Sequence, residues 1–297
     1  MMHSLFQYWR RLFFAQVPPH CLALMRIALG LTLLVFWLRY AADVPMMFSS
    51  DGPVFSFWEP QSGSLSILLT PPPVWAAWML YTIFLGSIAG ITLGWHYRTA
   101  CIAAIILITY FSLLSFHNFL ASWSRLLYFT LIVLSMSSAD RTLSLRMKTA
   151  KGSWTAWDKV PVWPQRIIAI QITATYLGVG MQKAYLPDWQ GGEILAYSFI
   201  NMWSTPFAFA IARLNIPIVF FDALTWCTKI LHGLLPIGLW SARFQKWCFL
   251  GGALFHLTIT ATMGMWWFLL LIPLYAAFVD PEKMRRIMNR GMQNPHL

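Results

Sequence analysis

The chain has 297 residues, of which 58% are hydrophobic and only 10% are charged, and its mean hydropathy is +0.59. In soluble domains about a quarter of the residues are charged, so this composition excludes an ordinary soluble globular protein. The net charge of +11 does not indicate a nucleic-acid partner, because no stripe of Lys and Arg interleaved with aromatic residues occurs outside the apolar runs. The four cysteines form no CxxC pair, and we expect buried apolar side chains rather than a metal site.

Apolar runs of membrane-spanning length recur along the whole sequence. A helix that crosses a bilayer needs about 20 mostly apolar residues. Runs near this length occur at 19–41, 73–95, 98–117, 120–138, 163–186, 215–240, 244–263 and 264–280. We therefore predict an all-α fold, a polytopic transmembrane helical bundle of about eight spans that lies in a lipid bilayer.

The two ends of the chain differ in composition from the spans. The segment SLFQYWRRLFFAQ mixes Arg10 and Arg11 with aromatic and aliphatic residues, which favours an interfacial helix within residues 1–18. No small-residue cleavage site follows it, so we expect the first span to remain in the mature protein. Residues 281–297 form a basic tail. We predict that residues 1–297 make up a single transmembrane helical domain.

The loops between the spans alternate in charge. Fifteen of the 21 Lys and Arg residues lie on the side of the N-terminus: Arg10, Arg11, Arg98, Arg141, Arg146, Lys148, Lys151, Lys159, Arg166, Arg243, Lys246, Lys283, Arg285, Arg286 and Arg290. The loop at 42–72 has none and carries three acidic residues. Because cytoplasmic loops hold an excess of Lys and Arg, we predict that both termini, including the tail at 281–297, are cytoplasmic.

Ionisable side chains inside the predicted spans are the first candidates for function, because they are costly in lipid and usually face the bundle interior. They are Arg26, Arg125, Lys183, Asp222, Lys229, His232 and His256. Structural interpretations stay open for all of them. An arginine can tie helices together through carbonyls or a carboxylate, a cation near a span end can snorkel, and a histidine can be a core hydrogen-bonding group.

The sixth predicted span carries several of these groups on one helix face. Asp222, Trp226 and Lys229 follow a spacing of three to four residues, which places them on the same side. Asp222 and Lys229 are two turns apart, about 10 Å by helical rise. This separation is too long for a direct ion pair, so each group needs a partner on another helix.

Lys183 stands out because it lies at the outer end of a span, on the face that is poor in basic residues. Its surroundings read YLGVGMQKAYLPDWQGGEILAY, in which glycines permit close helix approach and an unusual turn. Loss of hydration favours an uncharged amine, which is a usable base. The following segment, 187–214, is interrupted by charges, glycines and Pro206, so we expect an outer lid or re-entrant element rather than a ninth span.

Three stretches carry a family resemblance: RIALG in the first span, YLGVGMQKAYLPDWQGG, and the closing FHLTITATMGMWWFLLLIPLYAAFVDP. Together they resemble the HTTM domain, a membrane bundle shared by bacterial proteins and the vitamin K-dependent gamma-carboxylase. The resemblance covers most of the chain. It implies a multi-pass protein of a bacterial inner membrane.

The resemblance also implies roles for particular residues. In the carboxylase, a lysine shortly before an Asp-Trp pair is the proposed base of a hydroquinone-driven reaction, and Lys183 matches it five residues before Asp188 and Trp189. Many members carry a glutamate four residues before a proline in the sixth span, where this chain has His232 before Pro236. The supporting histidine of the carboxylase's fourth span is replaced here by SWSRLLYF, with Arg125.

Three hypotheses of function stay open. The first is an intramembrane enzyme that uses an isoprenoid quinone or hydroquinone, and no metal, in an outward-facing pocket, and that acts on a peptide or other substrate. Its catalytic residues would be Lys183 and His256, with cofactor-binding residues Arg125, Trp189, Asp222, Lys229 and His232, and Arg26 as a structural residue. The second is a non-catalytic membrane subunit or lipid-binding scaffold for a partner enzyme, which the replaced histidine favours. The third is a transporter, against which the lack of a visible inverted repeat counts.

Overall fold

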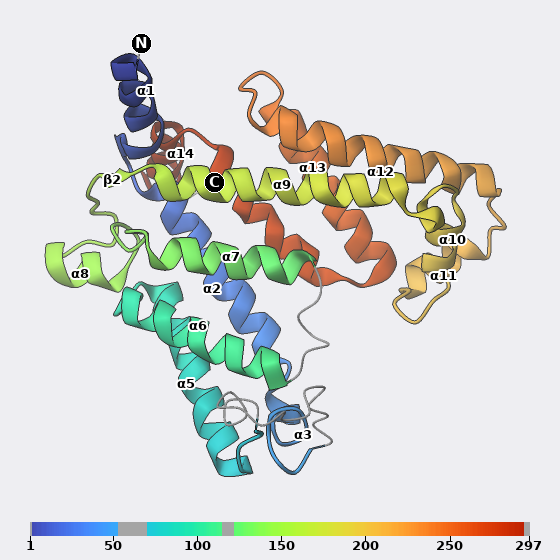
Figure 1. Cartoon of the computed structure of the whole chain (residues 1–297), viewed down its shortest axis with the longest axis horizontal. Helices are drawn as coiled ribbons and strands as arrows, with labels where there is room; N and C mark the ends of the chain where they lie inside the picture. Colours follow the sequence, from blue (N-terminus) through green and yellow to red (C-terminus); the bar gives the residue numbers. More distant parts are fainter. Residues whose placement is uncertain (1, 53–69, 115–121, 294–297) are drawn as a thin grey trace. The chain divides into compact units, whose positions relative to one another are not determined.

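A computed structural model of the chain describes residues 2–52, 70–114 and 122–293 (Figure 1). The structure is all-helical, with 75% helix and 2% strand, which confirms the predicted class. The two short strands, β1 (Gln16–Val17) and β2 (Val160–Pro161), pair antiparallel with Gln16 opposite Pro161. The chain divides into two compact units, Met1–Ile168 with Val279–Leu297 as unit 1 and Ala169–Phe278 as unit 2. The prediction of one domain over 1–297 stays a prediction.

Unit 1 contains most of the helices in the first half of the chain and the last helix. They are α1 (Met2–Phe14), α2 (His20–Leu38), η1 (Ala41–Asp43), α3 (Val44–Phe48), α5 (Val74–Leu93), α6 (Tyr97–Leu114), α7 (Ser122–Ser135), α8 (Leu145–Lys151) and α14 (Pro281–Gln293). Helix α5 packs against both α2 and α6. Its last turn ends on Gly94, whose φ of +67° is the left-handed conformation that favours glycine at a helix end. Only three residues join α5 to α6, so the two helices run antiparallel.

The core of unit 1 is aromatic where α2, α3, α5 and α6 meet. Trp37, Phe48, Tyr81, Phe84 and Phe111 are all buried, and the ring centroids of Trp37 and Phe84 lie 4.9 Å apart in an edge-to-face arrangement. The Tyr81 hydroxyl donates to the Trp37 carbonyl. Large buried rings, together with a tyrosine hydroxyl whose hydrogen bond is made, pack these helices tightly against one another. This part of unit 1 is therefore built as a core.

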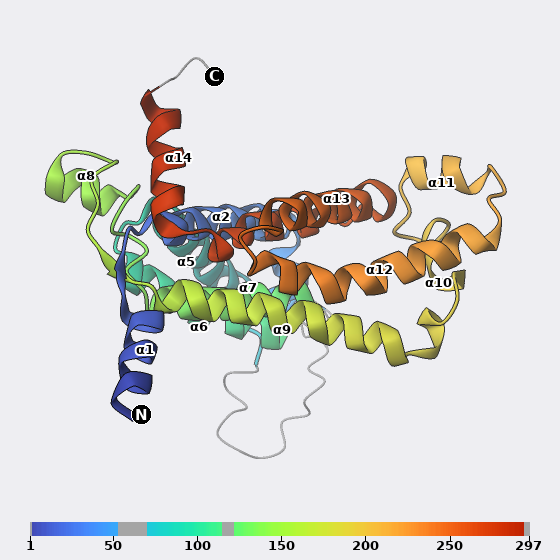
Figure 2. The same ribbon diagram turned by 90° about the horizontal axis from the view of Figure 1, so that it is seen from above.

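Unit 2 contains the longest helices of the second half of the chain. They are α9 (Trp163–Tyr185), which begins in unit 1, η3 (Pro187–Trp189), α10 (Glu193–Ser198), α11 (Pro206–Ala212), α12 (Ile218–Leu239), α13 (Gln245–Met263) and η4 (Trp266–Phe278). Helices α12 and α13 lie side by side in both views, and α13 packs against η4 (Figures 1 and 2). Gly264 ends α13 with a φ of +65°. The chain then turns back as η4, in which Pro273 cannot donate an α-helical hydrogen bond.

Four described helices are long and apolar enough to cross a membrane, namely α2, α5, α6 and α12. They fall in the first, second, third and sixth predicted spans. The other four predicted spans contain α7, α9, α13 and η4, which are shorter or carry more polar residues. Although η4 has only 13 residues, a 3-10 helix rises about 2.0 Å per residue and so reaches roughly 26 Å. The structure therefore establishes four candidate spans, and the count of eight stays a prediction.

The segment at 187–214, called the lid segment here, is broken into short elements and forms no long helix, while its placement as an outer lid or re-entrant element stays a prediction. Its helices, η3, α10 and α11, have three, six and seven residues. Helix α10 packs on α12, while the Thr205 amide donates to the Thr262 carbonyl at the end of α13, 3.0 Å away. The segment thus covers the first turn of one long helix and the last turn of another.

Candidate functional site

The predicted site residues divide between the two units. Arg26 and Arg125 belong to unit 1. The other six, Lys183, Trp189, Asp222, Lys229, His232 and His256, belong to unit 2. The candidate site therefore lies in unit 2, and the two arginines lie outside it.

Lys183 lies in the last turn of α9 and its ammonium group rests on an aromatic ring. Its Nζ atom is 4.2 Å from the ring centroid of Trp189, on η3. No described carboxylate lies within ion-pair distance of Nζ, and no hydrogen bond to it occurs within the described part of the chain. A cation over an indole face is attracted by the ring quadrupole, about 0.5–2 kcal/mol depending on its hydration. Trp189, which the family resemblance pointed to as a cofactor-binding residue, thus lies against Lys183.

A glycine lets the helix that carries Lys183 approach α12 closely. A Cβ atom on Gly180 would lie 3.0 Å from the Cβ of His232, so only glycine fits this contact without displacement. Gly180 is one turn before Lys183 on α9. His232 is 4% exposed, and its Nδ1 bonds the Thr228 carbonyl at 2.7 Å. Because a carbonyl only accepts, Nδ1 carries the proton and Nε2 is left as the acceptor of this ring.

His256 belongs to a buried hydrogen-bonded chain with two tyrosines that the sequence analysis did not single out. The Tyr176 hydroxyl, on α9, lies 2.8 Å from His256 Nε2, on α13, and 2.5 Å from the Tyr275 hydroxyl, on η4. All three side chains are at most 9% exposed. Gly252 makes room for Tyr275, because a Cβ there would lie 2.4 Å from its hydroxyl oxygen. The signal in the sequence was a tyrosine in the middle of an apolar run, two turns before Lys183, rather than at its end.

Aromatic rings surround both histidines. His256 stacks on Phe268 with the centroids 5.8 Å apart and the planes inclined by 17°. The ring centroid of His232 lies 5.3 Å from that of Phe255, in an edge-to-face arrangement. It lies 5.7 Å from that of Tyr176, whose ring is tilted by 55°. His256 Nδ1 is buried and has no hydrogen-bond partner in the described residues. An orphaned buried nitrogen costs about 1–3 kcal/mol, so its position calls for a ligand or a change of protonation.

Asp222 accepts a hydrogen bond from the lid segment. The amide of Gly192 donates to Asp222 Oδ1 at 2.6 Å, which ties the start of α10 to the second turn of α12. A Cβ on Gly192 would lie 2.5 Å from the Asp222 amide nitrogen, so the close approach needs glycine. The partner of Asp222 is thus a backbone amide directly before α10, rather than a group on another helix as its spacing predicted, and the bond ties the 187–214 segment to α12.

Lys229 confirms the helix-face prediction in part. Its Nζ lies 4.5 Å from the ring centroid of Trp226, one turn away on the same face of α12. The atom is buried and lacks a hydrogen-bond partner among the residues that the structure describes. Lys229 is thus a second cation of unit 2 that rests on tryptophan alone.

Arg26, in unit 1, has an entirely different environment. It is 0% exposed and donates to four backbone carbonyls, those of Ala139 (3.2 Å), Ile91 (2.7 Å), Thr92 (2.6 Å) and Leu143 (2.6 Å). Two of them, Ile91 and Thr92, lie in the last turn of α5, where carbonyls lack an α-helical partner, and the Ile91 carbonyl also accepts from the Gly94 amide at 3.1 Å. The contacts are to carbonyls, one of the two partner types expected for a structural arginine.

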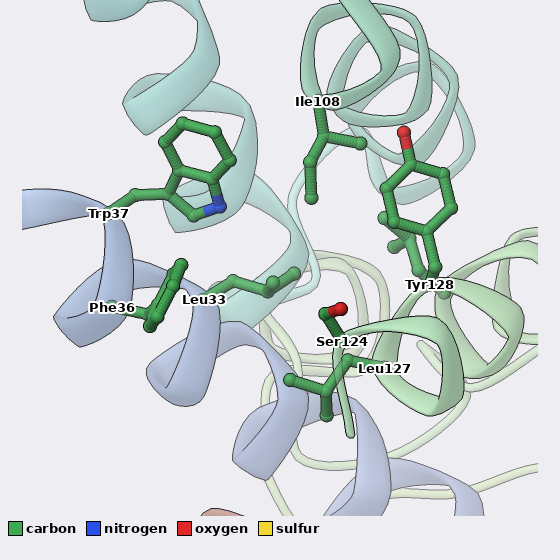
Figure 3. A pocket seen from close by; sticks show the side chains of 8 residues that line it. Leu33, Phe36, Trp37, Ile108, Ser124, Leu127 and Tyr128 are labelled. Atoms are coloured by element: carbon green, nitrogen blue, oxygen red, sulfur yellow. The ribbon is translucent and has the colours of Figure 1, made fainter. Parts of the chain in front are cut away.

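Arg125 is exposed at the start of α7 and borders a surface hollow of about 340 Å³. The hollow is also lined by Ser112, Ser124, Tyr128, Phe129 and Ile132. A smaller cavity of about 20 Å³ lies between α2, α6 and α7 (Figure 3). Figure 3 shows Trp37, Ser124 and Tyr128 among its lining side chains. A cavity of this size holds one water molecule and excludes a quinone ring.

The helices and the polar contacts described above define a class of protein. Long apolar helices, buried polar groups linked across helices and a small interrupted lid segment are those of an integral membrane helical protein. A model of the HTTM domain matches residues 14–281, and the chain belongs to this family. The resemblance seen in three stretches is thereby confirmed over most of the chain. Comparisons with curated proteins and with solved structures gave no match.

Proposed function

We propose that this HTTM-family protein is an intramembrane enzyme in which Lys183 is the base. The observation that carries the proposal is the setting of Lys183, which rests on Trp189, has no carboxylate partner among the described residues and stands one turn from the close contact between Gly180 and His232. Within the part of the chain that the structure describes, no acidic partner holds the side chain in its ammonium form. A positioned general base contributes typically 10²–10⁴-fold to a rate.

We further propose a quinone or hydroquinone as the cofactor of this site. Two features of unit 2 suit such a ring, namely the buried His256 Nδ1 that lacks a partner and the aromatic side chains around both histidines. A bound hydroquinone would supply the redox chemistry. The residues of the chain would hold it through histidine nitrogen atoms and aromatic faces, and Lys183 would accept the proton.

The substitution Lys183→Arg tests the catalytic role. Arginine keeps the positive charge and the contact with Trp189 but cannot be deprotonated near neutral pH. We expect it to fail to complement a strain that lacks the gene, while the protein is recovered in the membrane at the normal level. Lys246→Arg is the matched control, because Lys246 also rests on a tryptophan, with Nζ 5.0 Å from the Trp247 centroid. Full complementation by Lys183→Arg would refute the proposal.

Cofactor identity has a direct test. Organic extraction of the purified protein, followed by mass spectrometry, should yield an isoprenoid quinone in stoichiometric amount. The double substitution His232→Leu with His256→Leu should reduce the yield at unchanged protein recovery. A quinone content equal to that of an unrelated membrane protein purified in parallel would remove the cofactor from the proposal.

The alternative is a non-catalytic subunit or lipid-binding scaffold for a partner enzyme, and Lys229 favours it. A buried ammonium with no hydrogen-bond partner in the described chain, beside a tryptophan that is 57% exposed, suits a carboxylate of another subunit. Gentle purification should then recover a stoichiometric partner, and Lys229→Met should release it. Recovery of a partner together with full function of Lys183→Arg would decide for the scaffold.

We propose eight spans with both termini in the cytoplasm of a bacterial inner membrane, and an interfacial helix within residues 1–18. The charge of the loops supports this topology, since 15 of 21 basic residues then face the cytoplasm. A reporter fused after Leu297, and a tag within residues 142–160, should both report the cytoplasm. The exposed Met202, replaced by cysteine, should react with an impermeant reagent from the outer side. An external C-terminus would overturn the orientation.

A further inference from the structure

We infer that Tyr176, His256 and Tyr275 form a proton relay in the interior of unit 2. The three side chains come from three different elements, α9, α13 and η4, and meet in one continuous chain of two hydrogen bonds. Tyr176 is the middle member and contacts both others. The use of the relay in catalysis rests on the proposed function, whereas the relay itself can be tested without substrate or cofactor.

The hydrogen bonds of the chain can be satisfied in two ways. In the first arrangement, Tyr275 donates to Tyr176, Tyr176 donates to His256 Nε2, and the imidazole proton is on Nδ1. In the second, His256 Nε2 donates to Tyr176, Tyr176 donates to Tyr275, and Nδ1 is bare. Each arrangement keeps both bonds, and each leaves one donor without a partner in the described chain, Nδ1–H or the Tyr275 hydroxyl. The cost of an unpaired donor is of the same kind in both arrangements, and the relay requires that both be populated.

Conversion between the arrangements moves one proton through the chain. Starting from the second arrangement, a proton binds to His256 Nδ1. Nε2 passes its proton to the Tyr176 oxygen, Tyr176 passes its own to the Tyr275 oxygen, and Tyr275 releases one. The result is the first arrangement. One proton enters at Nδ1, one leaves at the Tyr275 hydroxyl, and every group ends neutral.

The surroundings suit this role. The three side chains are 9%, 2% and 4% exposed, so bulk water does not replace the hydrogen bonds between them. In a medium of low polarity, neighbouring hydrogen bonds polarise one another by roughly 10–30% per bond. His232 lies beside the middle member, with ring centroids 5.7 Å apart, and the Gly180 contact brings α9 to His232 one turn before Lys183. The relay and the helix face that carries Lys183 thus both lie next to His232.

Histidine ¹⁵N NMR of the purified resting protein tests the relay, with His256 assigned from the signal that disappears in His256→Gln. The relay predicts that Nε2 of the wild type shows both the protonated and the bare form. Tyr275→Phe should shift this signal toward that of a free imidazole, because the Tyr176 bond loses its reinforcement. On a Tyr176→Phe background, the same change at position 275 should have no effect.

Tyr185→Phe is the control, since Tyr185 is on the same helix as Tyr176 but is 80% exposed. Lys183→Arg should leave the His256 signal unchanged, which separates failure of the relay from failure of the proposed base. A single tautomer in the wild type would overturn the relay even if a variant does not fold. So would an effect of Tyr275→Phe that is the same with and without Tyr176, because the coupling would then not pass through the middle member.

Discussion

Arg26 in unit 1 and Lys183 in unit 2 are both cations within predicted spans, yet their surroundings differ in kind. Arg26 is completely buried and donates to four carbonyls from the end of α5 and from residues 139–143. Lys183 has no hydrogen bond within the described chain, and its ammonium group lies over the face of Trp189. A guanidinium in a full set of acceptors stabilises a fold. An ammonium without acceptors adds little to stability. It can also lose its proton without breaking a hydrogen bond, and the resulting amine can act as a base.

The same contrast extends to the neutral groups of the two units. In unit 1, the hydroxyls of Tyr81 and Tyr97 each donate to a single helix carbonyl, Trp37 for the first and Leu134 for the second. In unit 2, the Tyr176 hydroxyl is shared between His256 and Tyr275, and His256 Nδ1 has no partner in the described chain. Complete pairing against carbonyls fixes a structure, since a carbonyl can only accept. Groups that can both donate and accept leave the proton positions open.

The largest effect should come from Arg26→Met. The substitution removes a donor from four carbonyls, of which, within the described chain, only that of Ile91 keeps a backbone partner, the Gly94 amide. A carbonyl left without a partner costs about 1–3 kcal/mol, partly offset by relaxation and water entry. We expect a loss of at least about 3 kcal/mol, seen as poor recovery from the membrane and a much lower Tm in detergent. Arg98→Met is the control, because Arg98 is exposed in the same unit. Equal stability of the two variants would contradict the structural role of Arg26.

Gly192→Ala should have the next largest effect, because the contact of the lid segment is tight. The added Cβ would lie 2.5 Å from the Asp222 amide nitrogen and 2.6 Å from the Phe221 carbonyl carbon, both backbone atoms that cannot swing away. Overpacking of this kind costs about 1–3 kcal/mol. Gly178→Ala is the matched control, since no atom lies within 4 Å of its Cβ position. Proteolysis of the 187–214 segment should become faster in Gly192→Ala and not in Gly178→Ala.

The sequence predicts the helical class, the family and many helix ends, because these depend on local composition. Helix α5 begins directly after Pro73 and ends at Gly94, and α12 spans most of the predicted run at 215–240. The contact of Lys229 with Trp226 follows from spacing along one helix. The contact between Lys183 and Trp189 is a local one that sequence reasoning could predict, because only six positions separate the two residues.

The remaining features depend on contacts between segments that are far apart in the chain. The acceptors of Arg26 lie 65 to 117 positions away, and backbone carbonyls carry no sequence signature. Tyr176, His256 and Tyr275 are separated by 80 and 99 positions, and a tyrosine in an apolar run is otherwise typical of an interface anchor. Helix periodicity gives the face of each residue but not the helix that it meets.

A smaller effect is expected at the exposed ion pairs of unit 1. Asp158 accepts from Lys151 at 2.5 Å and from Arg141 at 3.1 Å, and the hydrogen bond from Lys151 followed by that from Arg141 lowers the pKa of its carboxyl group below 3.8. A lowered folded-state pKa gives stability that is present above the unfolded value and is lost as the pH falls through the folded value. Asp158→Asn should therefore lower Tm slightly at pH 7.

The pH dependence completes this test. The Tm difference between wild type and Asp158→Asn should shrink only below about pH 4, when the carboxyl group becomes protonated. High salt should reduce it at pH 7, because the side chain of Asp158 is 36% exposed and the pair is screened. A difference that persists unchanged at 1 M salt would place Asp158 in a buried network like that of Arg26.

The smallest change in stability should follow from Lys183→Met, and it separates the two units most sharply. Methionine removes a cation–π contact, about 0.5–2 kcal/mol, but also removes the cost of holding an ammonium where it has no hydrogen-bond acceptor. The two contributions oppose each other, so Tm should stay within a few degrees of the wild type. Complementation should nevertheless be lost, because the base is gone. Lys246→Met should preserve both. If Lys183→Met unfolds the protein as Arg26→Met is expected to, then Lys183 is a structural cation, and the contrast between the two units disappears.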